Sequence, residues 1–228
     1  MRAPLLLLLS LLSLFVTAQA DGPRADFANL ARYRAANDTL PPPTEGQERT
    51  VLLGNSITDA WASKYPDFFA EHQFVGRGIS GQTSPQLLLR FRQDVIDLQP
   101  TAVVIHIGTN DVAENTGPYD PDFTLGNIRS MVELARANDI KVYLASVLPA
   151  TAFRWRPELG DRSAEIVALN EQLAEYAAAQ DIPFIDYHAA LKNAAGGMDP
   201  ELAADGVHPT PAGYAIMERL LLVALADR

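Results

Sequence analysis

Two short segments of the sequence contain the residue types that nucleophilic acyl transfer requires. Ser56 follows the apolar run at residues 51–53 and a glycine, and His208 stands three residues after Asp205 in a loop that contains Gly and Pro. A serine hydroxyl at the start of a helix suits a nucleophile, because the positive helix end favours developing negative charge. A histidine oriented by a carboxylate has its second ring nitrogen free to accept the serine proton. Serine also caps helices without any catalysis, so this position alone leaves both roles open.

Two further loops contain hydrogen-bond donors suited to an oxyanion. The segment 76–83 matches the glycine spacing of a dinucleotide-binding loop, but it does not follow the first strand. The acidic residues downstream, Asp94 and Asp97, belong to an expected helix rather than to a strand end, so we reject that function. The backbone N–H groups around Gly81 can instead donate to an oxyanion, and the side-chain amide of Asn110 is a second neutral donor. Both residue types are also common in ordinary turns.

The composition predicts no metal, no cofactor and no nucleic-acid partner. The 228 residues include no cysteine, which excludes disulfides, thiolate metal sites and a cysteine nucleophile. Acidic residues outnumber basic ones by 28 to 18, and the net charge of −10 argues against binding to a phosphate backbone. Three other histidines do not cluster with carboxylates at metal-ligand spacing, and we expect structural roles for His72, His106 and His188.

These side chains must be positioned by a sheet whose strands alternate with helices. Short apolar runs rich in β-branched residues predict strands at 51–53, 74–75, 102–107, 142–145 and 184–185. Apolar residues at helical spacing between 125 and 135 and between 166 and 177 predict helices, and a last helix is expected at about 211–226. Such βαβ units imply a parallel sheet covered on both faces, in one α/β domain that spans 49–228. The site of such a sheet lies beyond the carboxyl ends of its strands.

The first 48 residues differ from the predicted domain. Residues 1–20 combine a short basic start, an apolar run and a small-residue motif, which predicts a signal peptide cleaved after Ala20. The run is shorter than the roughly 20 residues of a membrane span, so we favour export to the periplasm or outside the cell over a membrane anchor. Residues 21–48 are polar, contain three consecutive prolines and are expected to form an extended N-terminal extension.

Four sequence blocks together resemble the signature blocks of the SGNH (GDSL-type) hydrolase family. They are residues 54–56, Gly81, residues 108–111 and residues 205–208, and the resemblance covers about 49–226. It implies a three-layer α/β/α flavodoxin-like fold, with Ser56 as nucleophile, His208 as general base and Asp205 orienting the histidine. It also implies an oxyanion hole made by the backbone N–H groups of Ser56 and Gly81 and the side chain of Asn110. Asn55 stands where the commonest family pattern has Asp.

The expected function is hydrolysis of short-chain acyl esters, with acetyl foremost, because no long apolar lid is evident in the sequence. The segment 146–161 is a candidate pocket wall through Phe153 and Trp155, and Trp61 and Tyr65 could add apolar cover, although all these aromatic residues could equally cap the core. The expected substrate is a small-molecule or carbohydrate ester. The alternatives are an O-acyltransferase, a lysophospholipase or thioesterase on the same scaffold, and a non-catalytic carbohydrate-binding module.

Overall fold

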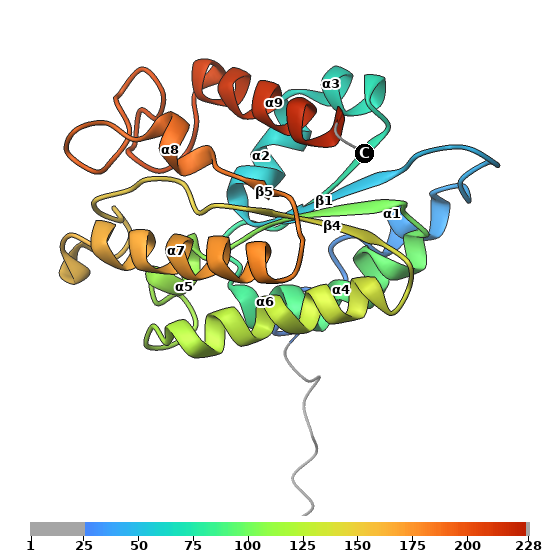
Figure 1. Ribbon diagram of the computed structural model, residues 1–228, viewed down its shortest axis with the longest axis horizontal. Coiled ribbons are helices and arrows are strands. Elements are labelled where there is room, and N and C mark those ends of the chain that lie inside the picture. The colour runs from blue at the N-terminus through green and yellow to red at the C-terminus, as the bar shows by residue number, and fades with distance from the viewer. Residues whose placement is uncertain (1–25, 227–228) are drawn as a thin grey trace, which may run out of the picture.

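Five short strands form one parallel sheet in the order β2-β1-β3-β4-β5. The structure, a computed structural model, describes residues 26–226, so the predicted signal peptide lies outside the described residues. The strand order is that of flavodoxin-like folds, and helices cover both faces of the sheet (Figure 1). The predicted three-layer α/β/α flavodoxin-like fold is therefore confirmed. The strands are β1 (Thr50–Gly54), β2 (Phe74–Gly78), β3 (Ala102–His106), β4 (Lys141–Ala145) and β5 (Phe184–Ile185).

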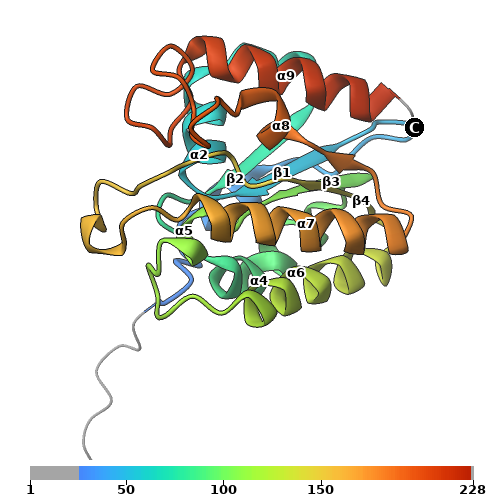
Figure 2. The same cartoon turned by 60° about the vertical axis from the view of Figure 1, so that its left-hand side comes forward.

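The helices lie in two layers, one on each side of the sheet (Figures 1 and 2). One layer consists of α2 (Ser56–Lys64), α3 (Pro66–Glu71), α8 (Tyr187–Leu191) and α9 (Pro211–Ala226). The other layer contains α4 (Ser84–Asp94), α6 (Pro121–Arg136) and α7 (Ser163–Ala179). The remaining short helices are α1 (Arg34–Thr39), η1 (Ile96–Leu98), α5 (Thr109–Val112) and η2 (Pro157–Leu159).

The central strands are apolar along their whole length because both of their faces are covered. Successive side chains of a strand point to opposite faces, so Val51 and Leu53 pack in the core beneath α4, α6 and α7. Leu52 packs in the second core beneath α2, α8 and α9. This double burial explains why the strands show continuous apolar runs instead of alternating patterns.

The chain reverses its direction of travel across the sheet between β1 and β3. From β1 it crosses to β2 on one side, and it then returns to β3 on the other side of β1. The loops after β1 and β3 therefore diverge onto opposite faces and leave a crevice beyond the strand ends, where flavodoxin-like folds bind their ligands. In the strand register, Gly54 is paired with Gly78 of β2 and with His106 of β3. The loops that carry Ser56, Gly81 and Asn110 consequently start side by side.

The part of the N-terminal extension that the structure describes, residues 26–48, is not simply extended. It contains α1, and Ala28 within it is buried. The amide of Asn37 donates to Asp94 Oδ1 at 2.7 Å, and the hydroxyl of Tyr33 donates to the carbonyl of Gly78. The polar composition concealed this packing because the extension docks through hydrogen bonds more than through an apolar face.

Among residues 26–226, none of the helices has the length and apolar character needed to cross a membrane. The longest, α7, has 17 residues, below the roughly 20 that span a bilayer.

Candidate active site

Ser56 is the first residue of α2, and a tight turn after β1 places it there. Asn55, rather than Ser56, caps the helix, because its side-chain oxygen accepts a hydrogen bond from the N–H of Ile57 at 3.1 Å. The capping alternative for the serine is therefore wrong, and its hydroxyl is left for another partner. Asn and Asp cap helices about equally well, which accounts for Asn55 at a position where Asp is more common.

Glycine is required at position 54 because three elements meet there. A Cβ atom on Gly54 would lie 2.2 Å from Thr58 Oγ1 and 2.8 Å from the backbone oxygen of His106. Both distances are too short for any side chain, so only glycine lets the end of β1 approach α2 and β3 this closely. The same packing places the start of α2 directly over the carboxyl end of the sheet.

Three side chains that are far apart in the sequence form one chain of hydrogen bonds. The hydroxyl of Ser56 lies 2.9 Å from His208 Nε2, although 152 positions separate the two residues. On the other side of the ring, His208 Nδ1 lies 2.7 Å from Asp205 Oδ2. An ionised carboxylate can only accept, so Nδ1 donates to Asp205 and Nε2 is left as the acceptor for the serine proton.

The local backbone keeps Asp205 ionised. Burial by itself raises the pKa of this carboxyl, but hydrogen bonds from the N–H and imidazole of His208 and from the N–H of Val207 outweigh burial and hold the pKa at about 2. The two backbone N–H groups both donate to Oδ1, at 2.7 and 2.9 Å, which leaves Oδ2 for the imidazole. The carboxylate is therefore charged and oriented throughout the neutral pH range.

Gly81 and Asn110 both lie beyond the carboxyl ends of the strands, Gly81 in the loop after β2 and Asn110 in the short helix α5 that follows β3. Gly81 adopts a φ of +80°, a left-handed conformation that favours glycine. The buried amide of Asn110 donates one hydrogen bond to the backbone oxygen of Gln82 at 2.9 Å. An amide nitrogen carries two donors, so this bond fixes the orientation of Asn110 and leaves its second N–H for a ligand.

A buried ionic network, which sequence reasoning missed, ties these loops together. Arg90 is fully buried, and its guanidinium pairs with Asp94 at 3.0 Å. It also donates to Gln82 Oε1 at 2.6 Å and to the backbone oxygen of Gly54 at 2.9 Å. One side chain thus holds the loop before Ser56 and the loop after Gly81. The i,i+4 spacing of Arg90 and Asp94 was the available sequence signal, but it is also common on exposed helix surfaces.

Asp111, the last residue of the third sequence block, has a structural role. It is buried and accepts hydrogen bonds from the N–H of Ser84 at 2.9 Å and from the hydroxyl of Ser84 at 2.6 Å. Burial raises the pKa of Asp111, and these hydrogen bonds partly offset the rise. It therefore anchors the start of α4 to α5, the short helix that carries Asn110.

The structure separates the other three histidines from this hydrogen-bonded chain. His106 is buried at the end of β3 against the ring of Tyr187, and burial lowers its pKa to about 4. His188 is buried in α8, and burial lowers its pKa as well. His72 contacts Phe68 and Phe74. No group of three or more potential metal-ligating side chains gathers within residues 26–226.

Of the aromatic residues proposed as pocket walls, Trp155 is the one that reaches the site. Trp61 and Phe153 are buried and belong to the two cores. Tyr65 packs against Tyr214 at the edge of the second core. Trp155, in contrast, is 41% exposed, and its ring centroid lies 6.3 Å from that of His208. Its segment, between β4 and α7, projects at the same end of the molecule as the segment after α8 (Figure 2).

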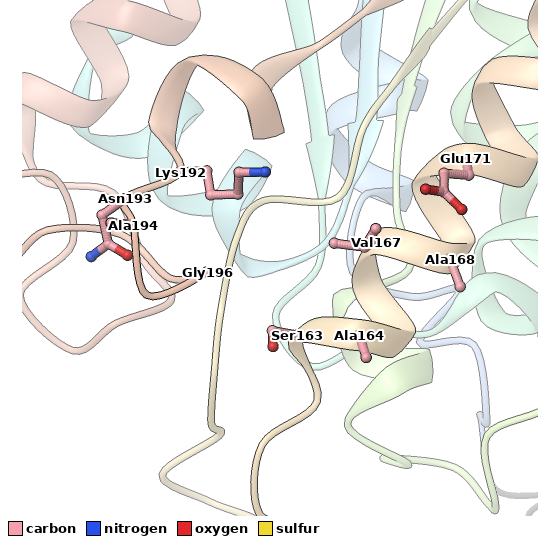
Figure 3. A pocket seen from close by; sticks show the side chains of 9 residues that line it. All are labelled: Ser163, Ala164, Val167, Ala168, Glu171, Lys192, Asn193, Ala194 and Gly196. Atoms are coloured by element: carbon pink, nitrogen blue, oxygen red, sulfur yellow. The ribbon is translucent and has the colours of Figure 1, made fainter.

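A hollow of about 380 Å³ lies between α7 and the segment that follows α8. Lys192 and Glu171 face it from opposite sides (Figure 3). Its walls include none of Ser56, Gly81, Asn110, Trp155 and His208, so it is separate from the candidate site.

Comparisons with known proteins agree on one family. The model of the GDSL-like lipase/acylhydrolase family matches residues 52–216. The crystal structure of a GDSL-like lipase from Bacteroides thetaiotaomicron is 51% identical, with a TM-score of 0.86 over 88% of this chain and 98% of that chain. An arylesterase from Vibrio mimicus is 26% identical over 186 residues, which cover 75% of this chain and 85% of the relative. An acetylxylan esterase from Xylanibacter ruminicola is 23% identical over 224 residues, which cover 82% of this chain and 45% of the relative.

Proposed function

The chain belongs to the GDSL-like lipase/acylhydrolase family and is a carboxylic ester hydrolase, and we propose that it acts on short-chain acyl esters through a covalent intermediate on Ser56. The observation that carries the proposal is the chain of hydrogen bonds from Ser56 through His208 to Asp205, at 2.9 and 2.7 Å. These residues belong to the four sequence blocks that resemble the SGNH family. The match to the family model confirms that the chain is a member of this family.

The proposed reaction begins when Ser56 Oγ attacks the ester carbonyl carbon and its proton moves to His208 Nε2. The carbonyl oxygen becomes an oxyanion, which accepts hydrogen bonds from the N–H groups of Ser56 and Gly81 and from the amide of Asn110. These donors stabilise the charge without adding a formal charge of their own. Asp205 stays ionised and stabilises the imidazolium.

The intermediate then collapses towards an acyl-enzyme. His208 gives its proton to the leaving alcohol oxygen, the bond between that oxygen and the carbonyl carbon breaks, and the acyl group remains on Ser56. A water molecule loses a proton to His208 and attacks the acyl carbon through a second oxyanion. Ser56 recovers its proton from His208, and the carboxylic acid is released.

A short acyl group, acetyl foremost, suits the described surface best. The site lies beyond the carboxyl ends of the strands. Among residues 26–226, Trp155 is the one large exposed aromatic residue beside His208. A relative named acetylxylan esterase acts, by its name, on an acetyl ester. We also propose that residues 1–20 direct export and are removed, so that the substrate is met in the periplasm or outside the cell.

The test compares wild-type protein with Ser56→Ala on p-nitrophenyl esters from acetate to laurate. We expect the wild type to prefer acetate and the variant to lose at least about 10⁴-fold in kcat, because the nucleophile is gone. Ser63→Ala is the matched control, since Ser63 lies on the same helix but bonds only to the backbone oxygen of Ala60.

A fluorophosphonate probe provides a readout that does not depend on the ester chosen. We expect mass spectrometry to find the label on Ser56. Full activity in Ser56→Ala, or labelling elsewhere, would remove the serine from the mechanism. A preference for laurate would instead contradict the short-chain assignment.

A further inference from the structure

A second hollow, of about 490 Å³, opens beside Gly81. The side chains that line it include Asn29, Gln82, Gln86, Asn115, Trp155 and Arg156. The hollow is far larger than an acetyl group needs, and it borders the glycine whose N–H we assign to the oxyanion. Neither Ser56 nor His208 lines the hollow, but a group that fills it lies beside Gly81 and hence beside the position of the reacting carbonyl.

Trp155 provides a rigid aromatic wall in this hollow. Its indole N–H donates to Asn115 Oδ1 at 2.8 Å, and Asn115 Nδ2 donates to the backbone oxygen of Gly81 at 3.0 Å. The neighbouring Arg156 donates to the backbone oxygen of Glu114 at 2.5 Å, which ties the Trp155 segment to the Asn115 segment. The exposed indole face is thus held in place before any ligand binds, which lowers the entropic cost of binding.

Apart from Ile79 and Arg156, the rest of the lining is neutral and polar. Its side chains are mainly amides and hydroxyls, and the one charged residue named among its walls, Arg156, is already paired with Glu158 at 2.6 Å and with Glu114 at 3.8 Å. The amides of Gln82, Gln86 and Asn115 each use one N–H and the oxygen within the protein, so a ligand meets their second N–H groups and the amide of Asn29. A long apolar chain would cover these donors without offering them hydrogen bonds, at an energetic cost. A hydroxyl-rich ring satisfies both kinds of wall, because its C–H face packs on an indole while its hydroxyls bond to amides.

The N-terminal extension completes this hollow from outside the residues that the family model matches. Asn29 lines it, whereas the family match begins at residue 52. Gln82 Nε2 donates to the backbone oxygen of Ala28 at 2.7 Å, and Gln86 Nε2 donates to that of Phe27 at 2.7 Å. The exposed side chain of Asn29 makes no hydrogen bond to residues 26–226, so it is available to a ligand.

We propose that this hollow binds the alcohol portion of the ester, and that this alcohol is a sugar. This assignment rests on the proposed function, because the sugar is then the leaving alcohol, whose oxygen receives the proton from His208. Trp155, whose ring centroid lies 6.3 Å from that of His208, is the stacking platform. Asn29 is a specificity-determining residue that the extension contributes.

Direct binding tests the sugar site without turnover. Ser56→Ala protein is titrated with xylotriose, which has no ester, and tryptophan fluorescence is recorded. The chain has two tryptophans and Trp61 is buried, so the exposed Trp155 dominates any change caused by a surface ligand. We expect a saturable shift. By calorimetry, Trp155→Ala in the same background should bind at least about tenfold more weakly and Asn29→Ala about threefold, while Val223→Ala, an exposed apolar control on α9, binds as before.

Trp155 also bonds to Asn115, which in turn bonds to Gly81, so its removal can slow the hydrolysis of every ester. The activities on two esters are therefore compared as a ratio. The ratio of kcat/KM for acetylated xylotriose to that for ethyl acetate should fall at least about tenfold in Trp155→Ala. Ethyl acetate has an alcohol portion too small to reach the indole, so the ratio isolates the sugar contact. An unchanged ratio would overturn the proposal.

The two proposals fail in different ways. If wild-type protein hydrolyses acetate esters through Ser56 but Ser56→Ala protein binds no sugar, the sugar site is wrong and the proposed function stands. If the protein binds xylotriose at Trp155 but Ser56→Ala retains full esterase activity, the proposed function is wrong. In that case the hollow remains a sugar site, but its assignment to the leaving alcohol is overturned.

Discussion

Asp205 binds His208 twice, once through the backbone and once through the ring. Oδ1 accepts the backbone N–H of His208 at 2.7 Å, and Oδ2 lies 2.7 Å from Nδ1 of the same residue. A spacing of three residues is enough for this double contact because the intervening turn contains Gly206 at a φ of +83°. The imidazole is therefore oriented by contacts within its own loop.

Replacement of Asp205 by Asn should reduce kcat by about 10⁴-fold, because an amide nitrogen cannot accept the Nδ1–H bond and the imidazole takes the wrong tautomer. KM should change little. Steady-state kinetics on p-nitrophenyl acetate measure both constants, with Asp139→Asn as an exposed control. Near-normal turnover in Asp205→Asn would show that the carboxylate does not orient the base.

The same carboxylate should influence acid stability. Its pKa is about 2 in the folded protein and 3.8 ordinarily, so its contribution to stability is present above pH 3.8 and is lost as the pH falls towards 2. Asp205→Asn removes this dependence. Thermal unfolding of both proteins between pH 5 and pH 2.5 should give melting temperatures that converge as the pH falls, and a constant difference would contradict the linkage.

Removal of the Asn110 amide should lower kcat by about 10²–10³-fold, the typical effect of one oxyanion donor. Asn110→Ala removes the donor, and Asn110→Asp adds a charge that repels both the oxyanion and the backbone oxygen of Gln82. The aspartate variant should therefore be the slower of the two. Asn138→Asp, at an exposed position after α6, is the matched control. Equal activity in all three variants would exclude Asn110 from the oxyanion hole.

Arg90→Met should destabilise the protein by about 3–5 kcal/mol, because it leaves the buried Asp94 without its ion-pair partner. The double variant Arg90→Met/Asp94→Leu removes both charges and should recover much of that loss. Urea denaturation measures the free energies of unfolding. A double variant no more stable than Arg90→Met would show that Arg90 acts through its bonds to Gly54 and Gln82 instead.

His106→Leu should make the protein less sensitive to mild acid. The folded pKa of about 4 lies below the unfolded value of 6.5, so the unfolded chain binds a proton first and stability falls as the pH drops from 6.5 to 4. The loss from this group is roughly 3 kcal/mol across that window. Urea denaturation at pH 7 and pH 4.5 should therefore give a smaller difference for His106→Leu than for wild type. Equal differences would mean that His106 is protonated in the folded state.

The five strands and the three longest helices, α6, α7 and α9, could be predicted from the sequence because their patterns are local. The strand expected at 51–53 is Thr50–Gly54, and the last helix expected at 211–226 is Pro211–Ala226. Continuous apolar runs and helical spacing record how each segment is buried, so they indicate element type without any knowledge of long-range contacts. The residue types able to form a nucleophile, a base and oxyanion donors could be recognised in the same way.

The sequence by itself therefore determined the order of the strands and long helices along the chain, the family and the residues to suspect, whereas only the tertiary structure decided which of them meet. Asn55 proved to be the helix cap in place of Ser56, because capping depends on the backbone direction at the end of β1. The sequence offered Trp61 and Trp155 alike as candidate pocket walls, yet Trp61 lies in a core and Trp155 faces His208. The docking of the N-terminal extension likewise gave no local signal. Burial and hydrogen-bond partners arise from contacts between segments far apart in the chain, and a pattern confined to one segment cannot encode them.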